Sequence, residues 1–313
     1  MTVDSELQFV SDVDVQRVVS YGSAIGALDN LLRTGTATEH TPLRVRTELP
    51  YGHLLYMPSQ AGGFVGMKMA SVSPGNAARG LPRIQGLMIL SDAETLEPLV
   101  VFDAQVITVR KTAALSALAV RYLATENSST LVLFGTGPQA WGHVEAIRHV
   151  RSLQQVIVIG RSSSPVQILV DRILATGLDA EAGTPHAVAE ADIVACCTSA
   201  SNPLFDSSLL REEATVVAIG SHSPGAREVD ASLVRKAVVV VESRHSAFAE
   251  AGDILLALQE GVAEHEAVNA EVADLVTGPL ETAGRPRLFK GVGEAWADVA
   301  VATLSAQKLG LIN

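Results

Sequence analysis

The stretch TLVLFGTGPQAWGHVEAI at residues 130–147 decides the fold. A strand-forming run ends at Gly135, and a helix-forming run begins at Pro138. The turn between them reads GxGxxA, in which the first Gly permits a tight turn and the second lets the backbone approach a pyrophosphate. The helix after the turn offers free N–H groups to phosphates. We therefore predict a dinucleotide site on Gly135, Thr136, Gly137, Pro138, Gln139 and Ala140, the alternative being a glycine turn that serves packing only.

The segments that follow continue the alternation of strand and helix. They are QQVIVIG (154–160), the helix-like PVQILVDRILATG (165–177), ADIVACCTS (191–199), ATVVAIG (214–220) and AVVVVES (237–243). The strands are rich in Val, Ile and Ala without polar alternation, which is typical of a parallel sheet covered on both faces. The sequence therefore predicts an α/β fold with a Rossmann-type doubly wound parallel sheet.

The first part of the chain has a different rhythm. A helix is predicted over 12–33, capped by Ser11 or Asp12 and ended near Gly35, and a second over 111–125. Between them, alternating runs punctuated by Gly and Pro predict mostly antiparallel strands. These runs are LRVRTEL (43–49), HLLYMP (53–58), GMKMASVS (66–73), IQGLMILSD (84–92) and LEPLVVFDA (96–104).

The last segment, EAWADVAVATLSAQKLGLI (294–312), is amphipathic and is expected to return to the first domain. The predicted division therefore has a discontinuous first domain. Residues 1–125 together with about 292–313 form an α+β domain, and residues 126–291 form the NAD(P)-binding Rossmann domain.

Composition excludes several classes of partner. The 313 residues carry a formal net charge of −11 and scattered Arg residues, whereas nucleic-acid binding needs a clustered basic surface. The start of the chain has no basic and apolar regions of a signal peptide, and no apolar run reaches the roughly 18 residues that span a bilayer. Cys196 and Cys197 are adjacent, which disfavours a disulfide and matches no metal spacing. We expect a cytoplasmic protein without metal, membrane or nucleic-acid partners.

The end of the second predicted strand bears on the choice of dinucleotide. An NAD site usually places Asp or Glu there, to accept from the ribose 2′-hydroxyl. Here the strand ends Ile159-Gly160-Arg161-Ser162, with no carboxylate. Arg161 can stack on adenine and pair with a 2′-phosphate, and Ser162 can add a hydrogen bond. We therefore predict NADP(H) in preference to NAD(H), the alternative being an exposed loop arginine with no ligand.

Further motifs stand in a fixed order along the chain. They are PLR (42–44), MP (57–58), GMKMASVSPGN (66–76), GLP (80–82), ITVRKTAALSALA (107–119), GTGPQA (135–140), ESRHSAFAEAGDI (242–254) and FKGVGEAWADVA (289–300). As an ordered set they resemble the ornithine cyclodeaminase/mu-crystallin family over nearly the whole chain. The resemblance implies a Rossmann domain and a mostly antiparallel domain that binds substrate and forms a homodimer. It also implies hydride transfer between a nicotinamide and the α-carbon of an amino or imino acid.

The resemblance assigns roles to three residues in the first domain. Arg44 matches the family arginine that pairs with the substrate carboxylate, and a guanidinium suits that task because it donates two parallel hydrogen bonds. Arg46 is the alternative for the same role. Lys68 matches the family lysine beside the substrate α-carbon, and its methionine neighbours indicate a desolvated ammonium that releases a proton near neutral pH. Asn76, in the matching P-x-N segment, is expected to help position cofactor or substrate.

The chain departs from the family pattern before Thr-Ala-Ala, where the family has arginine. Here the order is Arg110-Lys111-Thr112, so Lys111 takes the arginine's place. A lysine ammonium lacks the bidentate fork of arginine, so Lys111 is expected to hold the substrate anion more loosely. Thr112 is expected to open the second helix, with its hydroxyl and N–H facing the cofactor phosphates.

A second departure follows the strand ATVVAIG. Cyclodeaminases of the family carry an aspartate two residues after the strand-ending glycine, where His222 stands here. The carboxyl edge of an open α/β sheet is where ligands bind, so Thr198, Gly220 and Ser221 are predicted to contact the cofactor. His222 exchanges protons near pH 7, and as a cation it would repel an ornithine ammonium. Its alternative role is a cap of the loop.

Other polar residues receive structural interpretations. Arg227 and Glu228 match an R-E pair of the family and are expected to be structural, and His143 and His149 are expected on the surface of the helix after the glycine turn. His186 is a weaker candidate for the adenine side.

The function predicted from these residues is NADP(H)-dependent reduction of a cyclic imine or α-imino acid, or oxidation of the matching amine or amino acid. Lys68 and His222 are the candidate proton donors. One alternative is an NAD-dependent ornithine or lysine cyclodeaminase, which eliminates ammonia. The other is a protein that binds a ligand in the presence of NADPH without catalysis.

Overall fold

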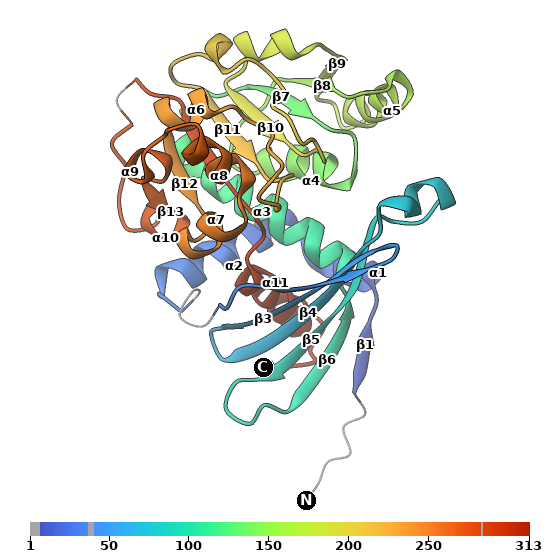
Figure 1. The fold of residues 1–313 in the computed structure, drawn as a ribbon. Coiled ribbons are helices and arrows are strands. Elements are labelled where there is room, and N and C mark those ends of the chain that lie inside the picture. Colours follow the sequence, from blue (N-terminus) through green and yellow to red (C-terminus); the bar gives the residue numbers. More distant parts are fainter. Residues whose placement is uncertain (1–6, 37–40, 283) are drawn as a thin grey trace, which may run out of the picture. The chain divides into compact units, whose positions relative to one another are not determined.

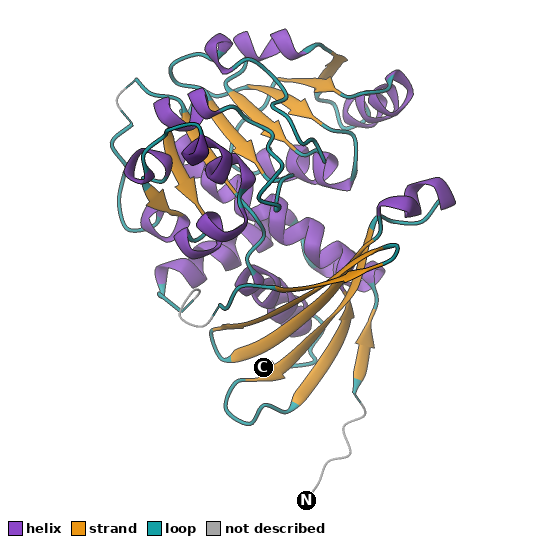
Figure 2. Ribbon diagram, viewed as in Figure 1, coloured by secondary structure: helices purple, strands orange, loops and turns teal. Residues whose placement is uncertain are grey.

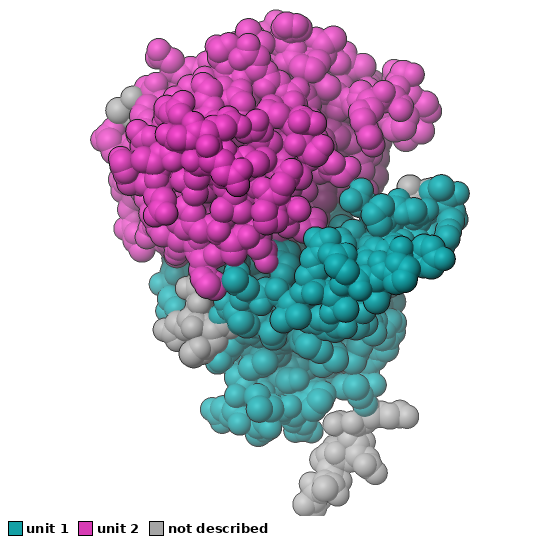
Figure 3. Space-filling view, in the orientation of Figure 1, with its two compact units in different colours: residues 1–111, 294–313 teal, residues 112–293 magenta. Residues whose placement is uncertain are grey.

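The computed structural model describes residues 7–36, 41–282 and 284–313. The chain divides into two compact units (Figure 3): unit 1 consists of Met1–Lys111 and Glu294–Asn313, and unit 2 of Thr112–Gly293. Unit 1 is therefore discontinuous in sequence. Its first boundary lies within a helix, whereas the sequence analysis placed that boundary near residue 125, where it expected the helix to end.

Unit 2 is built on an eight-stranded parallel sheet with helices around it (Figure 2). The order across the sheet is β13-β12-β14-β11-β10-β7-β8-β9. The strands are β7 Thr130–Phe134, β8 Gln155–Ile159, β9 Asp179–Ala182, β10 Ile193–Cys196, β11 Thr215–Ala218, β12 Val238–Val241, β13 Ala270–Glu271 and β14 Arg287–Lys290. Every residue of β10, β11, β12 and β14 is buried, which explains the continuous apolar runs in the sequence. The Rossmann-type parallel sheet is confirmed.

The strand order reverses beside β7. Strands β8 and β9 follow on one side of β7, and β10 and β11 follow on its other side (Figure 1). The carboxyl ends of β7 and β10 therefore flank a topological switch point, which is where open α/β sheets bind ligands. Gly135 directly follows β7, and Thr198 comes two residues after the end of β10. The predicted nucleotide turn thus lies at this edge of the sheet.

The helices of unit 2 are mostly short. They are α4 Pro138–Ile147, α5 Ser163–Leu174, α6 Ala231–Lys236, α7 Arg244–Glu250, α8 Gly252–Gln259, α9 Glu264–Ala267 and α10 Val272–Leu275, with the 3-10 helices η2 Pro185–Ala189 and η3 Ser207–Leu209. Helix α4 begins with Pro138, whose fixed φ and missing N–H suit the first helical position.

Strand β14 was not recognised in the sequence, although it lies between β11 and β12 in the sheet. Its four residues, RLFK, carry a charge at each end and so lack the apolar signature of the other central strands. Both charged side chains have polar partners in the structure. The Arg287 guanidinium donates to the carbonyl of Glu213 and the hydroxyl of Thr282, and the Lys290 ammonium forms an ion pair with Asp253.

His143 on α4 is fully buried, so its expected place on the helix surface is wrong. Its Nδ1 lies 2.8 Å from the carbonyl of Gln139, and its Nε2 lies 2.9 Å from the hydroxyl of Ser116. A carbonyl only accepts, so Nδ1 carries the proton and Nε2 accepts from the serine. Burial lowers the pKa of His143 to about 4, and the neutral ring joins α4 to the helix that contains Ser116.

Unit 1 contains a six-stranded sheet in the order β1-β6-β5-β4-β3-β2. The strands are β1 Gln8–Val10, β2 Val45–Leu49, β3 Gly52–Ala61, β4 Phe64–Val72, β5 Ile84–Asp92 and β6 Pro98–Asp103. All pairs are antiparallel except β1 with β6. Burial alternates along β3 and β4, and helix α11 Ala295–Lys308 packs against β3, β4 and β5 on the buried face. The C-terminal segment therefore completes the core of unit 1.

The predicted helix over 12–33 is two helices, α1 Asp12–Val18 and α2 Tyr21–Arg33. Ser11 caps α1, as expected, and Ser20 caps α2 by accepting from the N–H of Ser23. Because serine accepts well at a helix start, it favours a break where the apolar pattern alone reads as continuous. The second helix ends before Gly35, whose φ of +74° suits a residue without Cβ.

The second predicted helix begins earlier than expected. Helix α3 spans Ala104–Leu123, so Thr112 lies two turns inside it and does not open it. The carboxylate of Asp103 accepts from the N–H of Gln105, and that of Asp12 on α1 accepts from the N–H of Val106. These two acceptors satisfy N–H groups of the first turn. The β-branched residues of ITV (107–109) are thereby held in a helix that their propensity disfavours.

The described helices were also compared with the requirements of a membrane span. None of those in residues 7–36, 41–282 and 284–313 combines the length and apolar character that crossing a bilayer demands.

One irregular connection in unit 1 lies between β4 and β5. The 3-10 helix η1 Pro74–Arg79 joins β4 to β5, and the N–H groups of Asn76 and Leu81 close turns within this connection. Asn76 also donates from its side-chain amide to the carbonyl of Pro82, 3.0 Å away. The buried Asn76 therefore ties this connection together.

Candidate active site

The nucleotide turn of unit 2 requires glycine at its first position. Gly135 has a φ of +112°, and a Cβ there would lie 2.4 Å from the carbonyl oxygen of Cys197. The turn after β7 therefore passes directly against the end of β10. A Cβ on Gly137 would instead meet nothing within 4 Å, which leaves open space at the position expected to receive a pyrophosphate. The turn fits a dinucleotide.

The first turn of α4 adds donors to this position. Gly137 is its N-cap, no side chain caps it, and no acidic residue lies in its first turn. Uncapped N–H groups at a helix N-terminus attract an anion. Ala140 is fully buried and Pro138 is exposed, while Thr136 and Gln139 are half-buried. Within the motif, Ala140 packs in the interior, whereas the backbone at Gly137 and Pro138 is accessible.

The end of β8 forms the second part of this half of the site. A Cβ on Gly160 would lie 2.7 Å from Val166 and 3.1 Å from Thr136, so the glycine allows the two turns to pack closely. Arg161 and Ser162 after it are exposed. Among the described residues Arg161 has neither an ion-pair nor a hydrogen-bond partner, and Ser162 precedes α5 at the N-cap position without a side-chain capping bond. Both side chains are therefore accessible.

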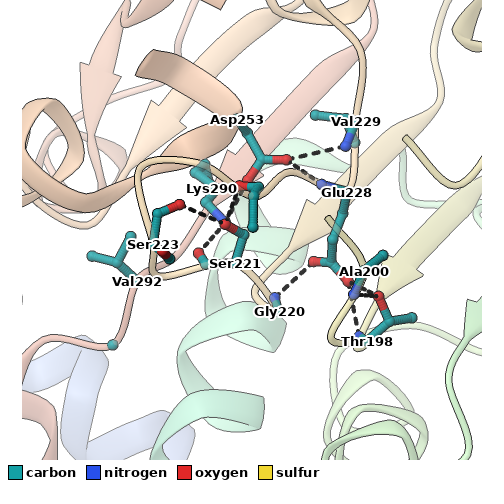
Figure 4. Close-up of polar contacts among 12 residues, drawn as sticks. Thr198, Ala200, Gly220, Ser221, Ser223, Glu228, Val229, Asp253, Lys290 and Val292 are labelled. Carbon is teal, nitrogen blue, oxygen red and sulfur yellow. Dashed lines mark hydrogen bonds and ion pairs between the residues drawn. The ribbon is translucent and has the colours of Figure 1, made fainter. Parts of the chain in front are cut away.

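Glu228 joins the carboxyl ends of β10 and β11 (Figure 4). One oxygen of its carboxylate accepts from the N–H and hydroxyl of Thr198, at 2.8 and 2.7 Å, and the other from the N–H of Gly220 at 2.7 Å. A Cβ on Gly220 would collide with both Thr198 and Glu228, so glycine is required. Burial raises the pKa of Glu228, against the lowering effects of Lys290 and these hydrogen bonds.

A buried ion pair holds the other end of the 220–229 turn. The carboxylate of Asp253 accepts from the N–H groups of Glu228 and Val229, and lies 2.8 Å from the ammonium of Lys290. Lys290 also donates to the carbonyl of Ser221 at 2.7 Å (Figure 4). The turn is therefore fixed at both ends, with His222 half-buried within it.

A second group of charges lies in unit 1. Lys68 on β4 donates to both carboxylate oxygens of Asp298 on α11, at 2.8 and 2.7 Å. Lys111 on α3 lies 3.5 Å from the same carboxylate and donates to the carbonyl of Glu294 at 3.0 Å. The side chains of all three charged residues are at most 4% exposed. We call Lys68, Lys111 and Asp298 the lysine–aspartate group.

The charges in this group are unbalanced. Burial lowers the pKa of Lys68 from 10.5 to about 8; Asp298 opposes the shift, and the charges of Lys111 and Arg44 add to it. Arg44 is therefore close enough to act on Lys68, whereas Arg46 pairs with Glu48 on the exposed strand β2. Among the described residues that act on Lys68, two are cations, Lys111 and Arg44, and one is a carboxylate, Asp298, so a bound anion would add negative charge where Lys68 needs it.

Asn76 and Arg110 each contact a residue outside the lysine–aspartate group. The side chain of Asn76 is engaged with Pro82 in the connection between β4 and β5. Arg110, the neighbour of Lys111, stacks over the ring of Tyr21 on α2 with its guanidinium carbon 4.1 Å from the ring centroid. The exchange of Arg110 and Lys111 relative to the family pattern thus places the lysine, not the arginine, beside Asp298.

The sequence analysis missed Asp298, although one feature could have found it. Asp298 is the single charged residue in the run AWADVAVA (295–302), whose residues are otherwise apolar and which we expected to be helical. A carboxylate within such a run requires a buried partner. Asp253 and Lys290 are likewise buried charged residues that pair with each other, and the sequence analysis singled out neither.

Metal binding was examined in the part of the chain that the structure describes. There, no three His, Cys, Asp or Glu side chains come together as a metal site requires.

The comparison with known families covers almost the entire chain. The model of the ornithine cyclodeaminase/mu-crystallin family matches residues 4–309. The chain belongs to the ornithine cyclodeaminase/mu-crystallin family. The resemblance inferred from the ordered motifs is confirmed.

Individual relatives in this family are similar over most of their length. The chain is 35% identical to the Delta(1)-pyrroline-2-carboxylate reductase of Bacillus cereus, over 85% of this chain and 86% of that protein. The Delta(1)-pyrroline-2-carboxylate reductase of Thermococcus litoralis, solved with NADH and L-proline, superposes with a TM-score of 0.91 at 28% identity, covering 96% and 97% of the two chains. An archaeal alanine dehydrogenase, solved as a dimer with bound NAD, gives a TM-score of 0.90 at 29% identity, covering 96% and 95%.

Proposed function

We propose that the chain is an NADP(H)-dependent oxidoreductase that reduces an imine bearing a carboxylate, of the cyclic or linear α-imino acid class, or oxidises the matching amino acid. The observation that carries the proposal is the lysine–aspartate group, in which a buried lysine with a lowered pKa stands in an excess of positive charge. The relatives named above reduce an imino acid or oxidise an amino acid, and they supply the reaction class.

Unit 2 supplies the residues that would hold the nucleotide. Gly135, Gly137 and the first turn of α4 suit the pyrophosphate, and Thr198, Gly220 and Ser221 lie at the adjoining strand ends. Thr112 is half-buried on α3, and we include it as a further contact. A bound nicotinamide would supply a hydride to the imine carbon.

NADP(H) rather than NAD(H) is proposed because the loop after β8 carries Arg161 and Ser162 and no carboxylate. The accessible guanidinium suits a 2′-phosphate, which accepts charge-assisted hydrogen bonds. We expect Arg161→Ala to raise the KM for NADPH about 10- to 100-fold, from the loss of such bonds, and to change the KM for NADH less than about twofold. Initial rates with each nucleotide measure this difference. An equal effect on both nucleotides would contradict the assignment.

The substrate carboxylate is proposed to bind in the field of Arg44, Lys68 and Lys111. Arg44 offers a fork of two donors, and Lys111 contributes charge from a buried position. Asn76, which closes the connection between β4 and β5, supports the site indirectly in this proposal. The same excess of cations would repel the side-chain ammonium of a diamino acid, which disfavours cyclodeamination. His222, in the place of the cyclodeaminase aspartate, agrees with that preference.

Lys68 is the proton donor that we favour, with His222 as the second candidate. In the reduction, the Lys68 ammonium gives its proton to the imine nitrogen, and the π electrons of the C=N bond become the nitrogen lone pair as the carbon gains the hydride. The neutral Lys68 amine then regains a proton from water. A pKa of about 8 suits this exchange near neutral pH.

A homodimer is proposed through the outward face of the unit 1 sheet. Directly paired residues share a face, and the row Phe9–Val101–Ile89–Met67–Pro58 crosses five strands with apolar side chains throughout. Phe9 is 61% exposed and Met67 is 39% exposed, so the row forms an apolar surface. We expect sedimentation to report a dimer for the wild type and a weaker dimer for Met67→Asp.

The central experiment follows the oxidation of NADPH with Delta(1)-pyrroline-2-carboxylate and with the corresponding ring imine that lacks the carboxylate. We expect turnover with the first and at least about a hundredfold lower kcat/KM with the second. The second imine has no carboxylate, so it forms no ion pair with the cations of the site. Folded protein that binds NADPH but turns over no imino acid would overturn the proposal. Release of ammonia from ornithine without net nucleotide oxidation would identify a cyclodeaminase instead.

A further inference from the structure

One carboxylate serves two lysines in the lysine–aspartate group. Both oxygens of Asp298 accept from Lys68, and Oδ2 also lies 3.5 Å from the ammonium of Lys111. The three side chains come from β4, α3 and α11 and are almost completely buried. A single negative charge therefore faces two positive charges where water cannot screen them.

The two lysines differ in what remains to them without Asp298. Lys111 also donates to the carbonyl of Glu294 at 3.0 Å, which satisfies part of its ammonium. The other contact of Lys68 is the hydroxyl of Thr108 at 3.5 Å, which is long for a hydrogen bond. Loss of the proton from Lys68 leaves Lys111 and Asp298 as an oppositely charged pair, and the Lys111 ammonium keeps its hydrogen bond to the carbonyl of Glu294.

We propose that Asp298 and Lys111 are positioning residues that together determine how readily Lys68 keeps its proton. Asp298 favours the ammonium form by pairing with it, and Lys111 opposes this by competing for the same carboxylate. The inference rests on the proposed function insofar as Lys68 is the proton donor. Asp298 stabilises the charged donor before transfer, and Lys111 balances the charge of Asp298 after the proton has left. Lys68 can then lose and regain its proton without leaving Asp298 buried and unpaired.

The other groups that act on Lys68 agree with this coupling. Arg44, in the segment before β2, adds a positive charge, and Thr108 on α3 is neutral. Burial is the largest cause of the lowered pKa of Lys68, Asp298 is the largest opposing one, and Lys111 adds to the lowering. The two proposed positioning residues thus act on Lys68 in opposite directions.

The coupling also gives a reason for lysine at position 111. A lysine ammonium is compact and can place one donor on the Glu294 carbonyl and another toward Asp298. The neighbouring Arg110 is stacked on Tyr21 and is directed to another partner. Lys111 is therefore suited to act through Asp298 as well as on a substrate anion.

The experiment observes Lys68 directly, without substrate or nucleotide. The chain has five lysines, Lys68, Lys111, Lys236, Lys290 and Lys308, so protein labelled with ¹³C at lysine Cε gives few signals. The Lys68 signal is assigned by its absence in Lys68→Met, and exposed Lys308 serves as an internal reference. We expect the Lys68 signal to titrate near pH 8 in the wild type.

Three variants test the coupling. Asp298→Asn should lower the titration midpoint of Lys68 by at least about one pH unit, because it removes the counter-charge. Lys111→Met should raise it by a similar amount, because Lys68 then has the carboxylate to itself. Lys111→Arg keeps the charge and should leave the midpoint within about half a pH unit of the wild type.

Opposite shifts are the result that a merely structural role would not produce. Shifts in the same direction, or no shift in Lys111→Met, would overturn the inference. If Asp298→Asn fails to fold, Lys111→Met alone decides, since a rise supports the coupling and no rise refutes it. The titration does not depend on turnover, so its outcome is separate from that of the substrate assay. In an active enzyme, the pH profile of kcat should move with the same midpoints.

Discussion

Each unit contains a buried lysine–aspartate pair, and the two pairs differ in their surroundings. The Lys68–Asp298 pair in unit 1 and the Lys290–Asp253 pair in unit 2 have nearly equal separations, 2.7 and 2.8 Å, and both are buried. The first pair meets two further cations, Lys111 and Arg44. The second meets a further carboxylate, Glu228, and four backbone groups of one turn accept or donate to these three side chains.

The comparison shows how to separate a functional buried pair from a structural one. A pair that is saturated by backbone groups fixes the chain, because every hydrogen bond ends on a turn that would otherwise move. A pair with excess charge and few backbone partners has a proton that is easily lost and room for a counter-ion. On this basis the unit 1 pair is proposed for chemistry and the unit 2 pair for holding the 220–229 turn.

The largest expected effect is on activity, from Lys68→Met. Loss of the proposed proton donor should lower kcat about 10²- to 10⁴-fold. Stability should not fall, because Met fits an apolar strand and Asp298 retains Lys111. Steady-state rates and urea unfolding measure the two quantities. Lys308→Met, an exposed lysine on α11, is the control and should change neither. Full activity in Lys68→Met would move the donor role to His222.

The next effect is on stability, from Asp253→Asn. Removing Asp253 takes from Lys290 its ion-pair partner and from the N–H groups of Glu228 and Val229 a charged acceptor, which should lower the free energy of unfolding by about 3–5 kcal/mol. The matched control is Glu145→Gln, which removes the partially exposed ion pair with Arg148 and should lower it by less than about 1 kcal/mol. Equal losses in the two variants, measured by denaturant unfolding, would remove the distinction between the pairs.

The smallest effect is the pH dependence that Lys68 confers. Its folded pKa of about 8 lies below the ordinary 10.5, so the unfolded chain binds more protons between these values. Stability relative to Lys68→Met should therefore rise with pH across this window, since the cost of the buried ammonium is relieved. Activity should instead fall about tenfold per pH unit above about pH 8, as the donor is lost. Parallel trends in the two quantities would contradict the assignment.

The parts of the fold that the sequence predicted are those with local signals. The nucleotide turn, its flanking strand and helix, and the alternating strands of unit 1 are each encoded within a short run of residues. The errors arise where distant residues decide. The start of α3 depends on Asp12, 94 residues before the N–H that it accepts from, and β14 is held by partners of its charged ends.

The candidate site follows the same rule. Lys68 was singled out from its methionine neighbours, but Asp298 lies 230 residues further along the chain, and no local pattern joins them. His143 was placed on the surface because its partner Ser116 belongs to another helix. Glycine at 135 and 220 could be predicted as turn residues, whereas the close approaches to Cys197 and Thr198 that require it are visible only in three dimensions.

Strand β14 bears on the order in which the chain acquires its structure. Strands β11 and β12 each pair with β14 and not with each other, so both keep an unpaired edge until residues 287–290 have left the ribosome. The residues that follow shortly afterwards form α11 and bring Asp298 to Lys68. Nascent chains shorter than this should therefore expose unpaired sheet edges, together with the β3–β5 face that α11 covers, and this is the stage of synthesis at which we expect the greatest dependence on chaperones.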